Sequence, residues 1–298
     1  MTALVAPEYA PSAHAEAASR SSVAVQHPSR HAWFPWSSCG DQCREDDLAR
    51  SAGRVLVAAR VARLIMITIA LAITAPVILL APRIVRRWYL RRASYRLLAA
   101  LGITVQIDDR RPFAGRVRGL VVANHISYLD ILALAVISPA HFVAKSEVAQ
   151  IPVISGLVRW LGVITIERES LRGLPDTIAR AVDGLHRDSS VAVFPEGTTR
   201  CGYEPGRFRP AFFQAAIDAG VPVTPIRLRF TTPGGATATE PSFIGDDTPA
   251  ATLRRVLRMR GLTVHIRVHE IELPDADRRS LAARCERIVA APPAAGWW

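Results

Sequence analysis

The sequence predicts an α/β fold: a mixed, largely parallel sheet flanked by helices and preceded by a hydrophobic membrane helix. Two observations carry this prediction. From about residue 100 onward, short apolar runs typical of buried strands alternate with helical segments. Before them, residues 64–82 contain no charged side chain. The chain of 298 residues is also long enough to bury the core of one large domain.

The first hundred residues divide into an arm and a membrane segment. Residues 1–50 are rich in Ala, Ser, Pro and His without sustained periodicity, which predicts a disordered N-terminal arm. Residues 55–99 form a membrane segment with a basic flank, because the apolar stretch, as a helix, matches a bilayer core in length. The alternatives are a buried core helix and a helix that lies in one leaflet. Arginine is more frequent after the apolar stretch than before it, at Arg83, Arg86, Arg87, Arg91, Arg92 and Arg96. The positive-inside rule therefore predicts a cell-membrane protein whose main domain faces the cytoplasm.

Residues 100–291 are predicted to form the folded domain, and residues 292–298 a C-terminal tail. Apolar or alternating runs predict strands at 119–123, 142–144, 163–166, 191–194, 223–228 and 263–271. Helical spacing predicts helices at about 130–136, 151–161, 174–187, 210–219 and 277–291. The fourth of these begins with Pro210 and is closed by Gly220.

The formal charge of +11 and the pI of about 10.6 come almost entirely from arginine, since Lys145 is the only lysine. Such a balance predicts attraction to anionic phosphate or to an anionic membrane surface. No recognisable nucleic-acid-binding module accompanies the charge, so no nucleic-acid partner is predicted.

The four cysteines, Cys39, Cys43, Cys201 and Cys285, are too sparse for a disulfide framework. The pair Cys39-x-x-x-Cys43, with His31 nearby, lacks a second ligand pair at the spacing of a zinc site. The sequence therefore predicts no metal.

A first group of chemistry-bearing residues is the run NHISYLD (residues 124–130), where a buried strand hands over to a helix. A histidine there can act as a general base, and a carboxylate can hold its tautomer. On one helix, His125 and Asp130 would point about 140° apart, so the pair requires His125 on the turn before the helix. The alternative is that Ser127-x-x-Asp130 is a capping box and His125 a polar core residue.

A second group, FPEGTTR (residues 194–200), also follows an apolar strand. Gly197 allows a sharp turn whose N–H groups can face an anion, and Thr198 can donate a hydrogen bond. Arg200 can grip a phosphate. The alternative is an ordinary strand-to-loop turn with a solvated charge pair.

Four blocks occur in order: Asn124-His125-x-Ser127-x-x-Asp130, then residues 162–168, 194–198 and 221–225. Their order and rough spacing resemble the glycerolipid acyltransferase family, whose best-known members are the 1-acylglycerol-3-phosphate acyltransferases. The resemblance covers residues 100–230 and makes residues 100–291 an acyltransferase domain.

The resemblance implies that His125 is the general base and that Asp130 orients and polarises it. It also implies that acyl-CoA or acyl carrier protein supplies the acyl group, with no metal or organic cofactor. Lys145 resembles part of a lysine–glutamate block of many members. The residues implied to bind the acceptor and its phosphate are Arg168, Glu196, Gly197, Thr198 and Arg200, with Lys145 added as a substrate-binding candidate.

The expected reaction is acylation of the free hydroxyl of a lysophospholipid at the membrane, with 1-acyl-glycerol-3-phosphate giving phosphatidic acid. Many relatives carry arginine directly after Phe-Pro-Glu-Gly-Thr, whereas Thr199 stands there in this chain and Arg200 follows one residue later. Another lyso-lipid, such as lyso-ornithine lipid, is therefore an alternative acceptor. A non-catalytic, basic, lipid-binding membrane-surface protein is the alternative of another class. The sequence has no Gly-x-Ser-x-Gly elbow, which counts against a serine hydrolase.

Overall fold

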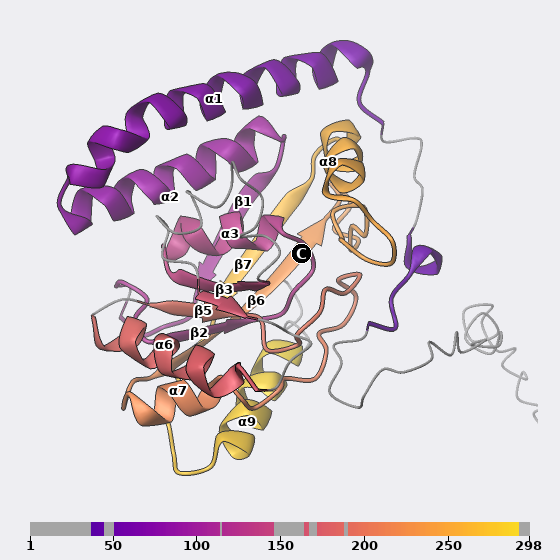
Figure 1. Ribbon diagram of the computed structural model, residues 1–298. Helices are drawn as coiled ribbons and strands as arrows, with labels where there is room; N and C mark the ends of the chain where they lie inside the picture. The colour runs from indigo at the N-terminus through magenta and orange to yellow at the C-terminus, as the bar shows by residue number, and fades with distance from the viewer. Residues whose placement is uncertain are drawn as a thin grey trace, which may run out of the picture. The chain divides into compact units, whose positions relative to one another are not determined.

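The computed structural model describes residues 37–44, 51–113, 115–145, 164–166, 172–187 and 190–291 (Figure 1). The helices in these ranges are η2 (Asp41–Cys43), α1 (Arg54–Leu80), α2 (Arg83–Ala100), α3 (Leu129–Ile137), α6 (Leu174–His186), α7 (Phe213–Asp218), α8 (Pro249–Arg258) and α9 (Arg278–Ala290). The strands are β1 (Thr104–Asp109), β2 (Leu120–Ala123), β3 (His141–Lys145), β4 (Ile164–Ile166), β5 (Val191–Val193), β6 (Val223–Thr231) and β7 (Thr263–Val268).

The strands form one sheet in the order β1-β7-β6-β2-β5-β3-β4. Every neighbouring pair is parallel except β6 with β7, which is antiparallel. The predicted mixed, largely parallel sheet is therefore confirmed. Since β2, β5, β3 and β4 are mutually parallel, their carboxyl ends meet at one edge of the sheet, where the loops after them converge.

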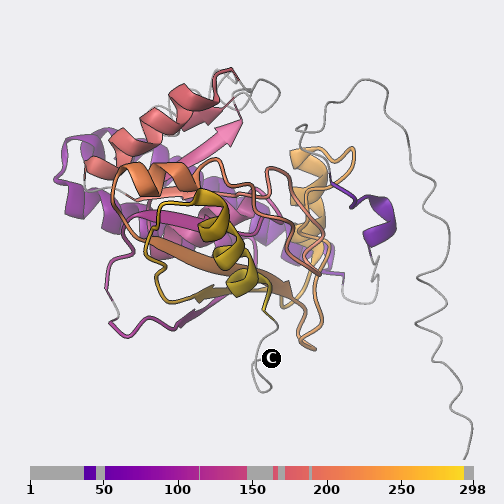
Figure 2. The same cartoon turned by 90° about the horizontal axis from the view of Figure 1, so that it is seen from below.

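Helices cover both faces of the sheet, which explains the uninterrupted apolar strands (Figures 1 and 2). On β2, Val121 and Ala123 join a core with α3 and α8, whereas Leu120 and Val122 join a second core with α6, α7 and α9. All four side chains of this strand are buried. The strand that carries the first site motif is thus held from both sides.

Several boundaries differ from the predicted ones. The strand β1 and the helix α8 were not predicted, β6 extends to Thr231, and β7 ends at Val268. The helix α7 begins at Phe213 rather than at Pro210. The helix predicted at 151–161 lies outside the described residues. The strand β1 was not predicted because it lies at the sheet edge, where its side chains are exposed or half-buried and form no apolar run.

The predicted membrane segment is a helical hairpin rather than one helix with a basic flank. Its first helix, α1, is long and apolar enough to cross a membrane, with a mean hydropathy of 2.3. Pro82 precedes α2, which returns alongside α1, and the Tyr89 hydroxyl lies 2.5 Å from Thr74 Oγ1. The basic flank itself is the second helix of this hairpin.

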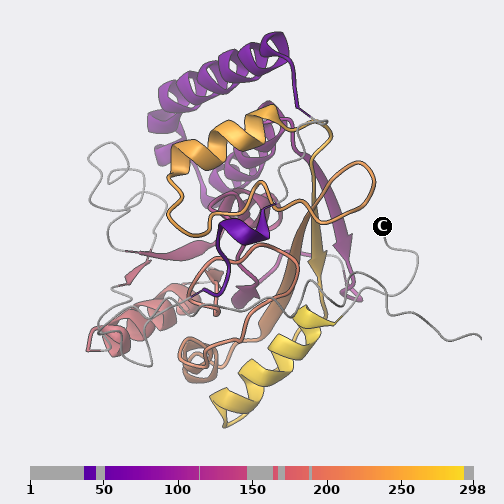
Figure 3. The ribbon, with the colours of Figure 1, turned by 90° about the vertical axis from the view of Figure 1, so that its right-hand side faces the viewer.

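Both helices of the hairpin are attached to the domain (Figure 3). Near the start of α1, the buried Arg60 donates hydrogen bonds to the carbonyls of Leu257 and Met259, and the Ala52 amide donates to Arg258. In α2, Arg91 Nε donates to the Val136 carbonyl of α3 at 2.9 Å. The hairpin therefore leaves the domain and comes back to it.

Residues 37–44 contact the folded domain, whereas the sequence predicted disorder for all of residues 1–50. The Arg44 guanidinium lies 2.6 Å from Asp247 and donates to the Ile244 carbonyl at 3.0 Å. Composition did not reveal this contact, because the partner carboxylate is about two hundred residues away along the chain. Residues 1–36 and 45–50 lie outside the described residues.

Candidate active site

The two predicted motifs meet at the carboxyl ends of neighbouring parallel strands, β2 and β5. His125 follows β2 by two residues, and Glu196 follows β5 by three. Lys145 is the last residue of β3, which pairs with β5 on the other side. Loops at such an edge are the usual place for ligands in open α/β sheets.

His125 lies on the turn before α3, the geometry that its spacing from Asp130 requires. Its Nδ1 is 2.9 Å from Asp130 Oδ2, and Asp130 is fully buried. A buried carboxylate on Nδ1 favours the tautomer with a proton on that nitrogen and leaves Nε2 as the base. The pair therefore has the arrangement of a general base with an orienting carboxylate.

Asp130 is the second residue of α3, and it makes one of the two contacts of a capping box: it accepts from the Ser127 N–H, whereas the Ser127 hydroxyl accepts from Leu129 instead of Asp130. Its Oδ2 accepts hydrogen bonds from the backbone N–H groups of Ile126 at 2.6 Å and Ser127 at 2.8 Å. Both N–H groups belong to the turn before α3, whose N-cap residue is Tyr128. The same oxygen fixes the turn and the histidine ring, which couples the direction of His125 to the folding of the turn.

The loop after β5 encloses His125. The Phe194 ring stacks on the imidazole with centroids 3.9 Å apart and planes inclined by 11°. The backbone N–H of His125 donates to Glu196 Oε1 at 3.3 Å, and the Arg200 N–H donates to the His125 carbonyl at 2.8 Å. With one face stacked on Phe194 and its backbone held, the ring has little freedom to turn.

Asn124 joins the end of β2 to β6 rather than facing a ligand. Its Nδ2 donates to the Leu228 carbonyl at 3.0 Å, and its Oδ1 accepts from the Leu228 N–H at 2.7 Å. This reciprocal pair continues the contact between the two strands beyond their last backbone pairing at Ala123 and Ile226. The contact keeps the strand end from shifting beneath His125.

Glu196 is buried, and burial raises its pKa to about 8. The N–H groups of Gly206 and His125 and the charge of Arg200 oppose this rise but do not overcome it. At neutral pH the side chain is therefore mainly a neutral acid. It holds the turn against His125 through hydrogen bonds.

We expect Glu196→Gln to flatten the pH dependence of stability. Between pH 4.5 and about 8 the unfolded chain has lost this proton while the folded protein keeps it. The native state then binds more protons, so the contribution of Glu196 to stability falls as pH rises through that range. The melting temperature of the variant relative to wild type should increase across this range. Glu204→Gln, at an exposed carboxylate, is the matched control; a parallel shift at all pH values in Glu196→Gln would contradict the prediction.

Two arginines lie at the turn of residues 195–197, and one of them was not predicted. Gly197 has φ +73°, a left-handed conformation that favours glycine, and an added Cβ there would lie 3.4 Å from Arg209 Nε. Arg200 Nε is 3.6 Å from Glu196 Oε2, and its side chain packs over Gly206. The backbone N–H of Arg209 donates to the Pro195 carbonyl at 2.9 Å, which sets Arg209 beside the turn.

The loop that contains Phe243 lies against both motifs. The Phe243 N–H donates to the Ile126 carbonyl at 3.0 Å, and the Thr199 hydroxyl donates to the Phe243 carbonyl. Tyr128 packs edge-on against the Phe243 ring. Thr199, which replaces the arginine of many relatives, is therefore used to hold this loop.

The structure says less about three of the predicted substrate-binding residues, Thr198, Lys145 and Arg168. Thr198 is half-buried in the turn. Lys145 is described by its backbone, at the edge of the sheet that His125 shares. Arg168 lies outside the described residues, two residues beyond the end of β4.

In the structure, a third cysteine lies beside Cys39 and Cys43, the pair for which the sequence predicted no zinc site. The sulfur atoms of Cys39, Cys43 and Cys201 lie within 4.8 Å of one another. The hydrogen bond between the Cys39 and Cys201 sulfur atoms, 3.5 Å apart, lowers the pKa of Cys39. The spacing of the cysteines along the chain did not predict this group, because Cys201 is 162 residues away from Cys39.

Comparison with known proteins agrees with this site. A family model described as Acyltransferase matches residues 102–229, which include both motifs. The 1-acyl-sn-glycerol-3-phosphate acyltransferase of Neisseria meningitidis is 36% identical over 201 residues, 65% of this chain and 76% of the relative. The lyso-ornithine lipid O-acyltransferase of Pseudomonas aeruginosa is 36% identical over 205 residues, 68% of this chain and 76% of the relative.

The same fold occurs in the crystal structure of the 1-acyl-sn-glycerophosphate (LPA) acyltransferase PlsC from Thermotoga maritima. That structure aligns with a TM-score of 0.55 at 20% identity, over 78% of this chain and 95% of the other. The matched relatives share O-acyl transfer as their reaction. This chain therefore belongs to the acyltransferase family and is an O-acyltransferase.

Proposed function

We propose that the protein transfers a fatty acyl group from acyl-CoA or acyl carrier protein to the free hydroxyl of 1-acyl-glycerol-3-phosphate, giving phosphatidic acid. The observation that carries the proposal is the juxtaposition of a base and an arginine-bearing turn. His125 and Asp130 lie 2.9 Å apart, and the loop that encloses them brings Arg200 and Arg209 to the same strand end.

The proposed reaction is direct acyl transfer. The acceptor oxygen attacks the thioester carbonyl carbon while its proton moves to His125 Nε2. The resulting imidazolium is stabilised by the buried Asp130 carboxylate. As the carbon–sulfur bond breaks, the departing thiolate takes that proton and leaves as a free thiol. No metal or organic cofactor is required by this step.

Positive charge at the turn supports a phosphate-bearing acceptor. The Gly197 N–H is used within the turn, where it donates to the Phe194 carbonyl at 3.1 Å. Arg209 lies over that turn, and guanidinium groups bind phosphate through paired hydrogen bonds. We include Glu196, Thr198 and Lys145 in the proposed acceptor site because each lies at or beyond a strand end on the same sheet edge. We include Arg168 only because residues 162–168 resemble an acceptor-binding block of the family.

A lyso-ornithine lipid is the second candidate acceptor, and one observation favours it. The Arg200 guanidinium faces the Glu196 side chain at 3.6 Å and packs over Gly206. A guanidinium held in this way is less available to a phosphate than one that projects from the turn. The relative from Pseudomonas aeruginosa is as similar to this chain as the one from Neisseria.

Acyl transfer with paired acceptors tests the proposal. Detergent-purified protein would receive labelled acyl-CoA, or acyl carrier protein loaded with the same chain, together with 1-acyl-glycerol-3-phosphate or lyso-ornithine lipid. We expect phosphatidic acid as the main product. Arg209→Ala should raise KM for the phosphate acceptor more than it lowers kcat, because the lost contact is made before and during the reaction.

The outcomes separate the candidates. Preference for lyso-ornithine lipid would keep the chemistry and reassign the acceptor. Lipid binding without transfer from either donor would support the non-catalytic membrane-surface protein. Arg207→Ala, at an exposed arginine of the same loop, is the matched control for Arg209.

We also propose that the hairpin of α1 and α2 inserts into one leaflet of the cell membrane, with the domain on the cytoplasmic side. Large apolar side chains are exposed along α1 and at the tip of the hairpin, including Ile73, Val77, Leu80 and Ile84. Surface of this kind is stabilised by lipid rather than water. The start of α1 and the C-terminal part of α2 contact the domain, which favours one leaflet over a span. The arginines of α2 suit the anionic cytoplasmic leaflet.

Charging the hairpin should abolish vesicle binding. We expect Ile73→Asp/Val77→Asp to stay in the soluble fraction when vesicles containing anionic lipid are floated, whereas wild type floats. Ile271→Asp/Leu273→Asp, which charges two exposed apolar residues of the domain, should float like wild type. In a one-leaflet arrangement both ends of the chain lie on the same side of the membrane. Digestion of the two terminal tags by protease from opposite sides of sealed membranes would therefore contradict this arrangement.

A further inference from the structure

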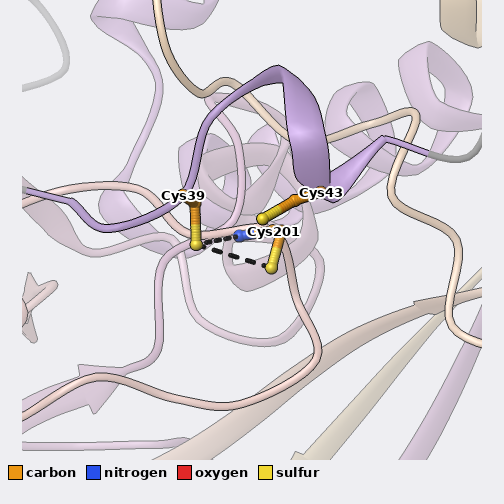
Figure 4. A group of neighbouring side chains, drawn as sticks. All are labelled: Cys39, Cys43 and Cys201. Atoms are coloured by element: carbon orange, nitrogen blue, oxygen red, sulfur yellow. Dashed lines mark hydrogen bonds between the residues drawn. The ribbon is translucent and has the colours of Figure 1, made fainter. Parts of the chain in front are cut away.

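Three cysteine side chains converge next to the candidate active site. Cys39 and Cys43 come from the segment before α1, and Cys201 comes from the loop after β5 (Figure 4). Their sulfur atoms all lie within 4.8 Å of one another, and those of Cys39 and Cys201 are 3.5 Å apart. The fourth cysteine, Cys285, lies in α9 within the core on the other face of the sheet.

We propose that Cys39, Cys43 and Cys201 bind one zinc ion through three thiolates, with a water molecule or another small ligand at the fourth position. This site goes beyond the proposed acyl transfer and does not depend on it. Binding displaces a proton from each cysteine that is still a thiol and forms three zinc–sulfur bonds, without any change of oxidation state.

The distances suit this ion. Tetrahedral zinc with bonds of about 2.3 Å separates its sulfur ligands by roughly 3.8 Å. The separation of 3.5 Å between Cys39 and Cys201 is close to that value, and the limit of 4.8 Å is within reach of small side-chain rotations. A disulfide of about 2.05 Å would join only two of the three and leave the third sulfur beside it.

The charges are also suitable. Three thiolates and Zn²⁺ leave a net charge of −1, and the Arg200 guanidinium interacts favourably with the Cys39 sulfur. The backbone N–H of Cys201 donates to the same sulfur at 3.4 Å. Hydrogen bonds and cations around coordinating sulfur are the outer contacts that commonly orient metal ligands. On the proposed cytoplasmic side, thiols stay reduced and are free to bind metal.

The ion would fasten the segment of residues 37–44 to the active-site loop. This segment contains one three-residue helix, η2, and none of the residues of η2 is buried. Burial of apolar surface therefore contributes little to its attachment, which rests on Arg44 and the cysteines. Cys201 directly follows Arg200, whose N–H donates to the His125 carbonyl. A bound ion would thereby restrain the loop that encloses His125.

Metal content of the full-length, tag-free protein tests the proposal. Protein purified with a reductant would be stripped with a chelator, reloaded with Zn²⁺, passed through a desalting column and measured by plasma mass spectrometry. We expect one zinc per wild-type chain and a loss of at least tenfold in Cys39→Ser, Cys43→Ser and Cys201→Ser. Cys285→Ala is the matched control and should keep the wild-type content.

A second measurement does not depend on the variants. Co²⁺ loaded into stripped wild-type protein should give thiolate-to-metal charge-transfer absorption and the intense visible bands of tetrahedral cobalt, and Zn²⁺ should remove them. Wild type that retains no zinc and shows no such bands would overturn the proposal, as would full zinc content in folded cysteine variants. A third result would overturn the proposal in favour of a redox pair. In that case, protein isolated without reductant would contain no zinc and a Cys39–Cys201 disulfide, and it would still bind no zinc after the disulfide had been reduced.

Discussion

Replacing His125 with alanine should lower kcat/KM for acyl transfer by about 10²–10⁴-fold, the usual contribution of a general base. The physical reason is the state of the ring in the structure. Its Nδ1 is bound to Asp130 at 2.9 Å, its face is stacked on Phe194, and Nε2 is the nitrogen left for the acceptor proton. Without it, the hydroxyl must attack the thioester with its proton still in place or lose that proton to water.

The measurement is the initial rate of acyl transfer, with folding checked by thermal unfolding. Alanine also removes a hydrogen bond from a buried carboxylate, which costs about 1–3 kcal/mol of stability. His125→Gln is therefore included, since its amide can donate to Asp130 but cannot act as a base. His186→Ala, at an exposed histidine of α6, should retain full activity. A folded His125→Gln protein with wild-type turnover would exclude the proposed mechanism.

Asp130→Asn should lower kcat on the order of 10²-fold, less than the roughly 10⁴-fold loss seen where an amide imposes the wrong histidine tautomer. The difference follows from the contacts of Oδ2. The N–H groups of Ile126 and Ser127 both point at this oxygen, so the asparagine carbonyl oxygen should occupy the same position. It can then still accept from His125 Nδ1. What is lost is the negative charge that stabilises the imidazolium.

A comparison with a double variant separates this role from a purely structural one. Asp183→Asn, on the exposed side of α6, serves as the control. The double variant His125→Ala/Asp130→Asn should be no slower than His125→Ala alone, because the two residues act as a unit. Additive losses would argue against that coupling.

The fold and the centre of the site could be predicted from sequence to the extent that they depend on local patterns. Apolar runs and helical spacing predicted the strands β2, β3, β5 and β6 and the helices α3, α6 and α9 near their observed positions. The spacing of His125 and Asp130 predicted that the histidine precedes the helix, because a fixed helical pitch leaves only that arrangement. The strand-loop positions of both motifs followed from the same patterns.

Contacts between distant segments were decided by the tertiary structure alone. The strand order brings β2 and β5 together, and only then does the loop of Glu196 enclose His125. The return of α2 along α1 makes the basic flank the second helix of a hairpin, and no local pattern in the sequence indicated this return. The approach of Arg209 to Gly197 and of Cys201 to Cys39 has no local signal either.

The sequence by itself determined the family, the sheet-forming segments and the pairing of His125 with Asp130, because these reside in short motifs and in periodic burial within single elements. The tertiary structure decided which charges face the turn, how the apolar hairpin folds back onto the domain and that three cysteines lie close together. Each of these depends on residues far apart in the chain. Their proximity is set by sheet order and by the packing of helices on both faces, and neither is encoded in the spacing of any single motif.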